Sequence, residues 1–443
     1  MAPHSGSNNG KGIQPSGPVE IRMYNVGFGD CFLLTFPYTK EDGGDRHVLI
    51  DFGSSENPKN AVKNHMLEVA KDIAKQCNGA RLTAVVVTHR HKDHLSGFAP
   101  KEGGGGTGDI IAELEPELVI QPWTEDPDVA KDAIGPGVAP ARGTRAMHVR
   151  GLEALHGCAE HALKYAMGNR SLPRAVVREM AFIGETNLKN LDAIENLMAM
   201  GEDGKSEYLS HGDQTALAGL LPGVKIHVLG PPTPEQWEQV ATQTDSDPEF
   251  WMLYSRLWRA LAKESASASG GPLFPDTLEV PVRRAKFDQR WFISQVDRLQ
   301  REMALSLVRA LDDALNNTSL ILLFEVGDQR LLFPGDAQIE NWRYALTQVQ
   351  GTRELLEGVT VYKVGHHGSR NATPRTLWKW FENKGKKQKP GRLKTLMSTK
   401  PGKHGSAQKR TEVPRKTLVD ELKAESDYTT TQTFKKGVLS DTV

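Results

Sequence analysis

Short runs of apolar residues recur along the chain, and glycine, proline or polar residues bound each of them. Runs of roughly four to eight apolar residues between such turn signals are typical of buried strands. The predicted strands lie near residues 20–25, 31–36, 47–51, 82–88, 117–121, 224–229, 319–325, 330–334, 359–364 and 393–398. Between two of them, Val62, Met66 and Val69 follow helical spacing, and we expect this helix to span about 61–76. The alternation of strands and helices predicts an α/β fold.

Two longer stretches interrupt this pattern, and we expect each to be a helical insertion into the core. The first covers about residues 123–210, with helices around 148–168 and 187–200. The second covers about residues 233–312 and is rich in aromatic residues. These aromatic residues recur at roughly helical spacing, which favours packing within helices over a wall on which a substrate stacks.

The composition of the chain is close to that of an ordinary globular protein. With 443 residues it is long enough for one large domain or two average ones. Its 55 basic and 55 acidic residues give no net charge, so no global field draws it to nucleic acid or membrane. Cys31, Cys77 and Cys158 are far apart, which excludes a disulfide framework and fits a reducing compartment.

The N-terminal residues do not have the pattern of a targeting segment. Residues 1–18 are rich in glycine, serine, asparagine and proline, so we expect a disordered tail rather than a signal peptide. No run approaches the roughly 18 apolar residues of a membrane-spanning helix. We therefore expect a cytoplasmic protein without membrane contact, in which residues 19–443 form one domain that carries both insertions.

The most informative segment follows the predicted strand near 82–88 and reads His89-Arg-His91-Lys-Asp93-His94. It gathers three imidazoles and one carboxylate within six residues at the end of a buried strand. Imidazole and carboxylate together suit zinc, and also manganese or iron. The alternating His89 and His91 can bind one metal, while Asp93 and His94 turn towards a second. A polar loop that is rich in histidine by chance does not account for this spacing.

Three further strand ends carry residues of the same kind. Asp336 ends an apolar run, His366 and His367 end another, and Asp51 ends a run upstream. Along the chain, Asp51 comes first, and the histidine-rich loop, Asp336 and the two histidines follow. These motifs in this order resemble the metallo-β-lactamase superfamily. The resemblance implies an αββα sandwich of two mixed sheets flanked by helices. It also implies that Asp336 bridges two metals and that Asp51 supports the loop without binding metal.

Other motifs resemble one branch of that superfamily, which includes the nuclease-like domain of ComEC and choline-phosphate esterases. They are Tyr24–Leu34 with Asn25 in place of the branch's aspartate, Asn316–Leu320, Lys363–Ser369, and Leu396–Thr399 followed by Val413–Leu418. The resemblance covers about residues 20–440 and is interrupted by the insertions. It favours a hydrolase of the ComEC-like branch.

A dinuclear site of this kind uses two divalent ions to hold and activate a hydroxide. We expect zinc, with manganese or iron as alternatives. His89 and His91 are assigned to the first metal, and Asp93 and His94 to the second, with Asp336 between them.

One of the paired histidines, His366 or His367, is expected to complete the second site. The other would contact the substrate or protonate a leaving oxygen, and the sequence leaves open which does which. We therefore predict that Asp93, His366 and His367 take part in catalysis.

The first metal site lacks a ligand that many relatives have. They place a further histidine before the predicted strand near 319–325, where this chain has Asn316 and Asn317. We expect a weaker, more open first site, completed by water or an amide oxygen, with both asparagines facing the substrate. His211 is an alternative third ligand, although it precedes a different strand.

A basic stretch near the end of the chain bears on the substrate. Residues 384–416 contain twelve lysines and arginines and one acid, and we expect Lys400, Lys403 and His404 to contact substrate. A solvated charged loop explains the stretch equally well. Because its basic residues are not interleaved with aromatic ones, no base recognition is predicted.

These features favour a phosphodiesterase or nuclease that acts on nucleic acid or another phosphodiester. One alternative is a hydrolase of carboxylic esters, lactones or amides. Another is a metal-binding regulatory module that docks partner proteins through its insertions. The oligomeric state stays open.

Overall fold

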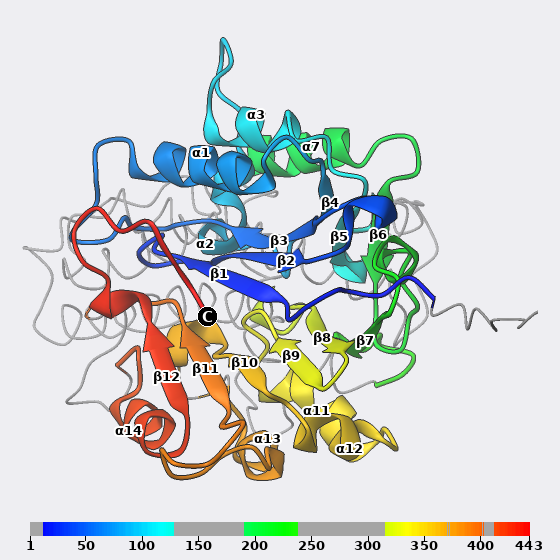
Figure 1. The fold of residues 1–443 in the computed structure, drawn as a ribbon, viewed down its shortest axis with the longest axis vertical. Helices are drawn as coiled ribbons and strands as arrows, with labels where there is room; N and C mark the ends of the chain where they lie inside the picture. Colours follow the sequence, from blue (N-terminus) through cyan, green and yellow to red (C-terminus); the bar gives the residue numbers. More distant parts are fainter. Residues whose placement is uncertain are drawn as a thin grey trace, which may run out of the picture.

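The computed structural model describes residues 12–127, 190–237, 315–369, 371, 373–400, 402 and 412–443. Within these residues two sheets lie face to face, and helices cover both outer faces (Figure 1). The predicted mixed α/β fold with two sheets and flanking helices is therefore confirmed. Among the described residues, no helix is long and apolar enough to cross a membrane.

The first sheet has the strand order β13-β1-β2-β3-β4-β5-β6. Its strands are β1 (Glu20–Tyr24), β2 (Cys31–Phe36), β3 (Arg46–Phe52), β4 (Leu82–Val86), β5 (Val119–Pro122), β6 (Ser206–Leu209) and β13 (Ser440–Thr442). Strands β13, β1, β2 and β3 pair antiparallel, whereas β3 to β6 pair parallel. Parallel pairing brings the carboxyl ends of β3 and β4 to one edge of this sheet.

The second sheet has the order β12-β11-β10-β9-β8-β7. Its strands are β7 (Val224–Gly230), β8 (Ile321–Val326), β9 (Gln329–Phe333), β10 (Val361–Lys363), β11 (Lys394–Met397) and β12 (Asp427–Thr430). Strands β9 to β12 run parallel, so the carboxyl ends of β9, β10 and β11 also share one edge.

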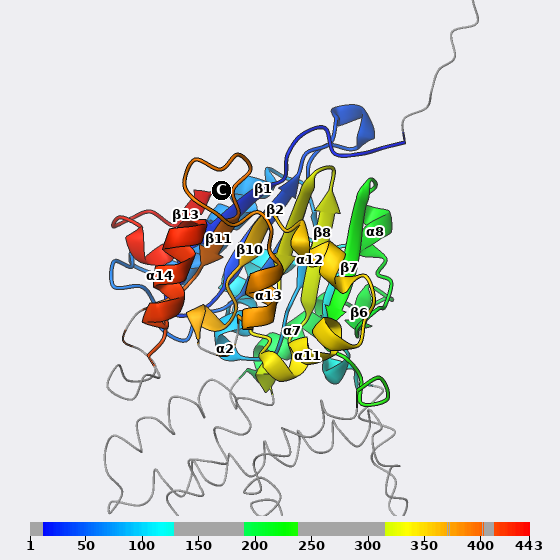
Figure 2. The same cartoon turned by 90° about the horizontal axis from the view of Figure 1, so that it is seen from below.

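Helices pack on the outer face of each sheet because each helix places apolar side chains against apolar side chains of the sheet. The first sheet is covered by α1 (His65–Cys77), α3 (Thr107–Ala112) and α7 (Leu191–Met200). Val69 and Ile73 of α1 lie in one buried cluster with Leu49 and Val85 of the sheet. The helices α11 (Ile339–Thr347), α12 (Thr352–Glu357), α13 (Arg375–Trp380) and α14 (Lys416–Glu425) lie outside the second sheet (Figure 2).

The main core lies between the two sheets. Phe32 of the first sheet meets Phe333 of the second edge to face, with ring centroids 5.6 Å apart. The rings of Phe36 and Phe324 also meet across the sheets, tilted relative to each other, with centroids 6.0 Å apart. Aromatic pairs of this kind bury large apolar areas and so hold the sheets in one relative position.

All ten predicted strands are present, and the helix expected over 61–76 is α1. Strands β6, β12 and β13 were not predicted. Strand β6 and helix α7 lie within the range expected to be the first insertion, yet β6 pairs with β5 and α7 packs on the first sheet. The end of that range, residues 190–210, therefore belongs to the core.

Most of both expected insertions lies outside the described residues. So do residues 1–11 of the expected tail, whereas residues 12–18 have no helix or strand and Ser16 donates a backbone hydrogen bond to Pro37. The division into tail, domain and insertions stays a prediction.

Candidate metal centre

The loop after β4 is held in place by Asp51 at the end of β3. Its carboxylate accepts hydrogen bonds from the backbone N and Oγ1 of Thr88, at 2.7 and 2.8 Å. It also accepts one from Nδ1 of His94 at 2.8 Å. A carboxylate with three donors fixes the orientation of the His94 ring and leaves Nε2 facing away. Asp51 thus has the supporting position that the family resemblance implies.

Close backbone packing also sets the position of this loop. A Cβ on Gly53 would lie 2.4 Å from the backbone N of His94 and 2.5 Å from the carbonyl carbon of Asp93. Only glycine allows this approach, because no real Cβ comes so near to backbone atoms. Gly53 therefore lets the loop after β4 lie directly against the end of β3.

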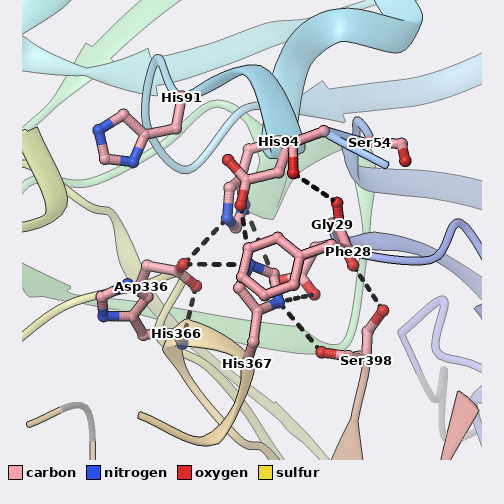
Figure 3. A network of polar contacts seen from close by, with 12 residues as sticks. Phe28, Gly29, Ser54, His91, His94, Asp336, His366, His367 and Ser398 are labelled. Atoms are coloured by element: carbon pink, nitrogen blue, oxygen red, sulfur yellow. Dashed lines mark hydrogen bonds and ion pairs between the residues drawn. The ribbon is translucent and has the colours of Figure 1, made fainter. Parts of the chain in front are cut away.

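Four ligand groups converge at the shared edge of the two sheets. The ligand atoms of Asp93, His94, Asp336 and His367 all lie within 4.8 Å of one another, and all four residues are buried. Nε2 of His94 lies 3.1 Å from Oδ2 of Asp336 (Figure 3). Nε2 of His367 lies 2.9 Å from Oδ2 of Asp93. Two imidazoles and two carboxylates at this spacing form a donor set for a divalent cation.

A buried carboxylate oxygen without a hydrogen-bond partner supports a cation site at this cluster. Oδ1 of Asp93 is buried and has no hydrogen-bond partner. Buried polar oxygens without partners are rare, because each costs free energy. A cation at the cluster would remove that cost, so the residues present fit a bound metal.

His89 and His91 lie beside this cluster. Nε2 of His89 is 2.9 Å from Nδ1 of His91, and the His89 ring lies 4.1 Å from that of His94, centroid to centroid. Burial lowers the pKa of His91 to about 4 and holds the pKa of His89 well below its usual range. Both rings are therefore neutral near pH 7, which is the state that binds metal.

The pKa values of His94 and His367 are raised instead of lowered. Burial alone would lower the pKa of His94, but the carboxylates of Asp336 and Asp51 outweigh it and raise that pKa well above its usual range. Burial likewise opposes protonation of His367, and the carboxylates of Asp336 and Asp93 overcome it. In the metal-free protein, protons on these two rings thus balance the buried carboxylates.

The structure separates the roles of the paired histidines. Nδ1 of His367 lies 3.1 Å from the carbonyl oxygen of Ser398, so Nε2 faces the cluster. His366 lies outside the cluster and is only half-buried, and its backbone N donates to Oδ1 of Asp336 at 2.8 Å. Both residues have positive φ angles of 45° and 51°, which turn the two rings apart. Of the pair, His367 joins the candidate ligands.

Comparison with known families agrees with this geometry. Residues 24–141 match the family model of the metallo-beta-lactamase superfamily. Proteins of that superfamily are usually hydrolases that bind divalent metals. A search of curated proteins gave no match to the chain.

The match includes the loop with His89, His91, Asp93 and His94. It ends well before Asp336, so the candidate ligands Asp336 and His367 lie beyond the matched segment. The assignment to the ComEC-like branch rests on sequence motifs alone and stays a prediction.

Asn316, predicted near the first metal, is fully buried, and neither atom of its side-chain amide has a hydrogen-bond partner. It begins a turn in which the backbone N of Ser319 bonds its carbonyl oxygen, at 3.1 Å. The Ser319 hydroxyl accepts from the backbone N of Asp336, and Leu320 donates to the carbonyl of Thr88. The turn therefore lies against the two loops that carry candidate ligands, the loop after β4 and the loop after β9. Asn317 instead donates to Glu340 at 3.3 Å.

Two groups of candidate ligands occur among the described residues, Asp93, His94, Asp336 and His367, and Asp30, Asp51 and His94. His211 belongs to neither group. Its Nδ1 lies 2.9 Å from the carbonyl oxygen of Leu229, and its ring packs edge to face on Tyr344. Both contacts belong to the packing of β7 against α11. They favour a structural role for His211 over that of a third ligand.

The basic stretch is partly engaged in internal contacts. Nζ of Lys400 lies 2.5 Å from a carboxylate oxygen of Glu56 and donates to the carbonyl of Asn57. Arg392 is 6% exposed and pairs with Asp427 at 2.8 Å. Lys403 and His404 lie outside the described residues, and substrate contact by Lys400, Lys403 and His404 stays a prediction.

Two residues of the site were missed as such by the sequence reasoning, Asp30 and Lys363. The Lys363 ammonium is buried, forms an ion pair with Asp30, and lies 3.1 Å from Oδ1 of Asp336. Asp30 is completely buried, with its carboxylate 3.8 Å from Nδ1 of both His94 and His367. Both residues lie in segments whose sequence resembles the ComEC-like branch, and this resemblance is the signal that could have found them.

Proposed function

We propose that this protein is a metal-dependent hydrolase with two divalent ions, most readily zinc, with manganese or iron as alternatives. The observation that carries the proposal is the convergence of Asp93, His94, Asp336 and His367 from two sheets, with His89 and His91 beside them. When bound, such ions supply Lewis acidity and lower the pKa of a water molecule.

The residues divide the work of holding these ions. Asp93, His94 and His367 would hold the second ion, and His89 and His91 the first, with Asp336 between them. Asp51 and the Ser398 carbonyl each accept from the other ring nitrogen of a ligand histidine. Such outer contacts fix which nitrogen is available and keep the ring in one orientation.

The two halves of the site are unequal. The second is surrounded by four described ligand groups, whereas the first has two imidazoles and Asp336. The side-chain amide of Asn316 has no hydrogen-bond partner and lies on the turn that contacts Thr88 and Asp336. We expect the first half to be completed by this amide or by water, and to leave room for substrate.

We propose a phosphodiester as the substrate class, either nucleic acid or a smaller phosphodiester. Two non-bridging phosphate oxygens suit an open metal position, and the motifs shared with the ComEC-like branch support the same chemistry. His366, half-buried beside Asp336, would contact the substrate or its leaving oxygen. Because Lys400, Arg392 and Arg415 are engaged with acids of the chain, a small phosphodiester is as good a candidate as a polyanion.

The proposal is tested by metal analysis followed by an activity panel. Purified protein would be loaded with zinc, manganese or iron and assayed with single-stranded DNA, RNA, bis-p-nitrophenyl phosphate, and chromogenic lactones and lactams. We expect phosphodiester cleavage that a chelator abolishes. Turnover of lactones or lactams alone would instead indicate a carboxylic hydrolase. Bound metal without any turnover would indicate a regulatory module that acts with partner proteins.

A further inference from the structure

A buried lysine lies directly behind the candidate bridging carboxylate. Lys363, the last residue of β10, is 2% exposed. Its ammonium donates to the carbonyl oxygen of Gly335 at 2.9 Å and to Oδ1 of Asp336 at 3.1 Å. It also forms an ion pair with Asp30, which precedes β2 in the other sheet. An ammonium has three donors, and here each has an oxygen partner.

The two oxygens of Asp336 are therefore not equivalent. Oδ1 accepts from the Lys363 ammonium and from the backbone N of His366, at 3.1 and 2.8 Å. Oδ2 faces the ligand histidines, 3.1 Å from Nε2 of His94 and 3.6 Å from Nε2 of His367. A carboxylate with both oxygens free could bind one metal with each, but here Oδ1 already has two donors.

We infer that Lys363 is a positioning residue that leaves Asp336 a single oxygen, Oδ2, for the metals, and that Asp30 holds Lys363 in this position. The inference rests on the proposed metal centre and specifies how its central carboxylate is used. It specifies how Asp336 would bridge two metals, through Oδ2 alone.

The charges of these groups support the assignment. The buried Lys363 ammonium lies between the carboxylates of Asp30 and Asp336. Because a buried ion that loses its partner is strongly unfavourable, Asp30 and Lys363 have to be removed together in a test.

A purely structural role is the competing explanation, since Asp30 and Lys363 also join the two sheets. A matched control separates the two roles. Arg392 and Asp427 form another ion pair with a buried cation, at 2.8 Å, and neither residue contacts Asp336. Removing that pair costs stability without releasing the carboxylate.

The experiment compares the double variants Asp30→Asn/Lys363→Met and Arg392→Met/Asp427→Asn with the full wild-type chain. Zinc affinity is measured on folded protein by competition with a chromophoric chelator. We expect affinity to fall about 10–100-fold in the first variant, as is typical when an outer partner of a ligand is lost. In the control variant, zinc affinity should stay within about twofold of wild type, even if its thermal stability falls. Equal zinc affinity in folded wild type and first variant would overturn the inference.

A second measurement needs no variant and applies if the first one fails to fold. Lys363 is the one buried lysine among the described residues, so its ammonium should give a slowly exchanging nitrogen–proton NMR signal. We expect this signal in both metal-free and zinc-loaded protein, and its loss on zinc loading would show that Lys363 leaves Asp336. A wild type that binds zinc without hydrolysing any substrate would refute the proposed activity and leave this comparison intact. A wild type that binds no divalent ion would refute both.

Discussion

Nε2 of His367 lies 2.9 Å from Oδ2 of Asp93, although the two residues are 274 positions apart. Asp93 follows β4 in the first sheet, and His367 follows β10 in the second. Their contact is therefore a direct link between the sheets, at the point where the ligand groups meet.

Replacing either central carboxylate should abolish activity while the fold survives. In Asp93→Ala or Asp336→Ala, the cluster loses an anionic ligand, so we expect less bound metal and a loss of turnover beyond the roughly 100-fold seen for outer contacts. Metal content and kcat/KM of purified protein measure this. Glu68→Gln, which changes an exposed carboxylate on α1, is the control and should behave as wild type. Full activity in Asp336→Ala would contradict the assignment.

Asp51 should matter for affinity without binding metal. In Asp51→Asn, an NH2 group replaces one of the two acceptor oxygens, so at least one donor from Thr88 or His94 loses its partner. We expect metal affinity to fall by about 10–100-fold with the fold retained. Asp109→Asn serves as control, because that carboxylate accepts from the backbone N of Gly106 and lies at the start of α3. It should lower thermal stability alone.

Metal binding should strengthen as pH rises. The pKa values of His94 and His367 are raised in the metal-free protein, so both rings hold protons below and somewhat above pH 6.5. Metal has to displace these protons, whereas His89 and His91 are already neutral. Calorimetry in buffers of different ionisation enthalpy should show proton release. Affinity that stays constant from about pH 6 to 8 would contradict this charge distribution.

The same shifts affect the metal-free fold. Because the folded-state pKa values of His94 and His367 are raised, their stabilising contribution is complete below pH 6.5 and is lost as pH rises through the folded values. His89 and His91, with lowered values, destabilise the fold as pH falls below 6.5. Urea unfolding of metal-free protein at several pH values measures the balance of the two effects.

Asn316 should show a trade-off between stability and metal binding. Asn316→Leu removes two buried polar atoms that have no partner, so the metal-free protein should gain about 1–3 kcal/mol in free energy of unfolding. The first site should at the same time bind metal more weakly. The neighbouring Asn317→Leu breaks a hydrogen bond to Glu340 and should lose stability instead. Unchanged metal stoichiometry and affinity in Asn316→Leu would remove this residue from the site.

The sequence predicted the elements that are long and apolar. Every predicted strand is buried on at least part of its length, and the ligand residues follow strand ends as expected. Strands β6, β12 and β13 read Ser-Glu-Tyr-Leu, Asp-Tyr-Thr-Thr and Ser-Asp-Thr, and such short, polar segments carry no strand periodicity. Their pairing is decided by neighbours that are distant in the chain.

Parts of the site were beyond sequence reasoning for a different reason. His366 and His367 are identical side chains on adjacent positions, and only their left-handed backbone shows which ring meets Asp93. Lys363 and Asp30 are 333 positions apart, and charged residues at strand ends are ordinarily exposed. Their burial becomes visible only when the two sheets are placed together.

The division of the ligands between the two sheets has a consequence for how the protein is made. During synthesis, His89, His91, Asp93 and His94 leave the ribosome long before Asp336 and His367. The early part of the chain then offers four of the six proposed ligands but lacks Asp336 and His367, and His367 further depends on the carbonyl of Ser398. The proposed second ion site is therefore complete only after β9, β10 and β11 have docked on the first sheet.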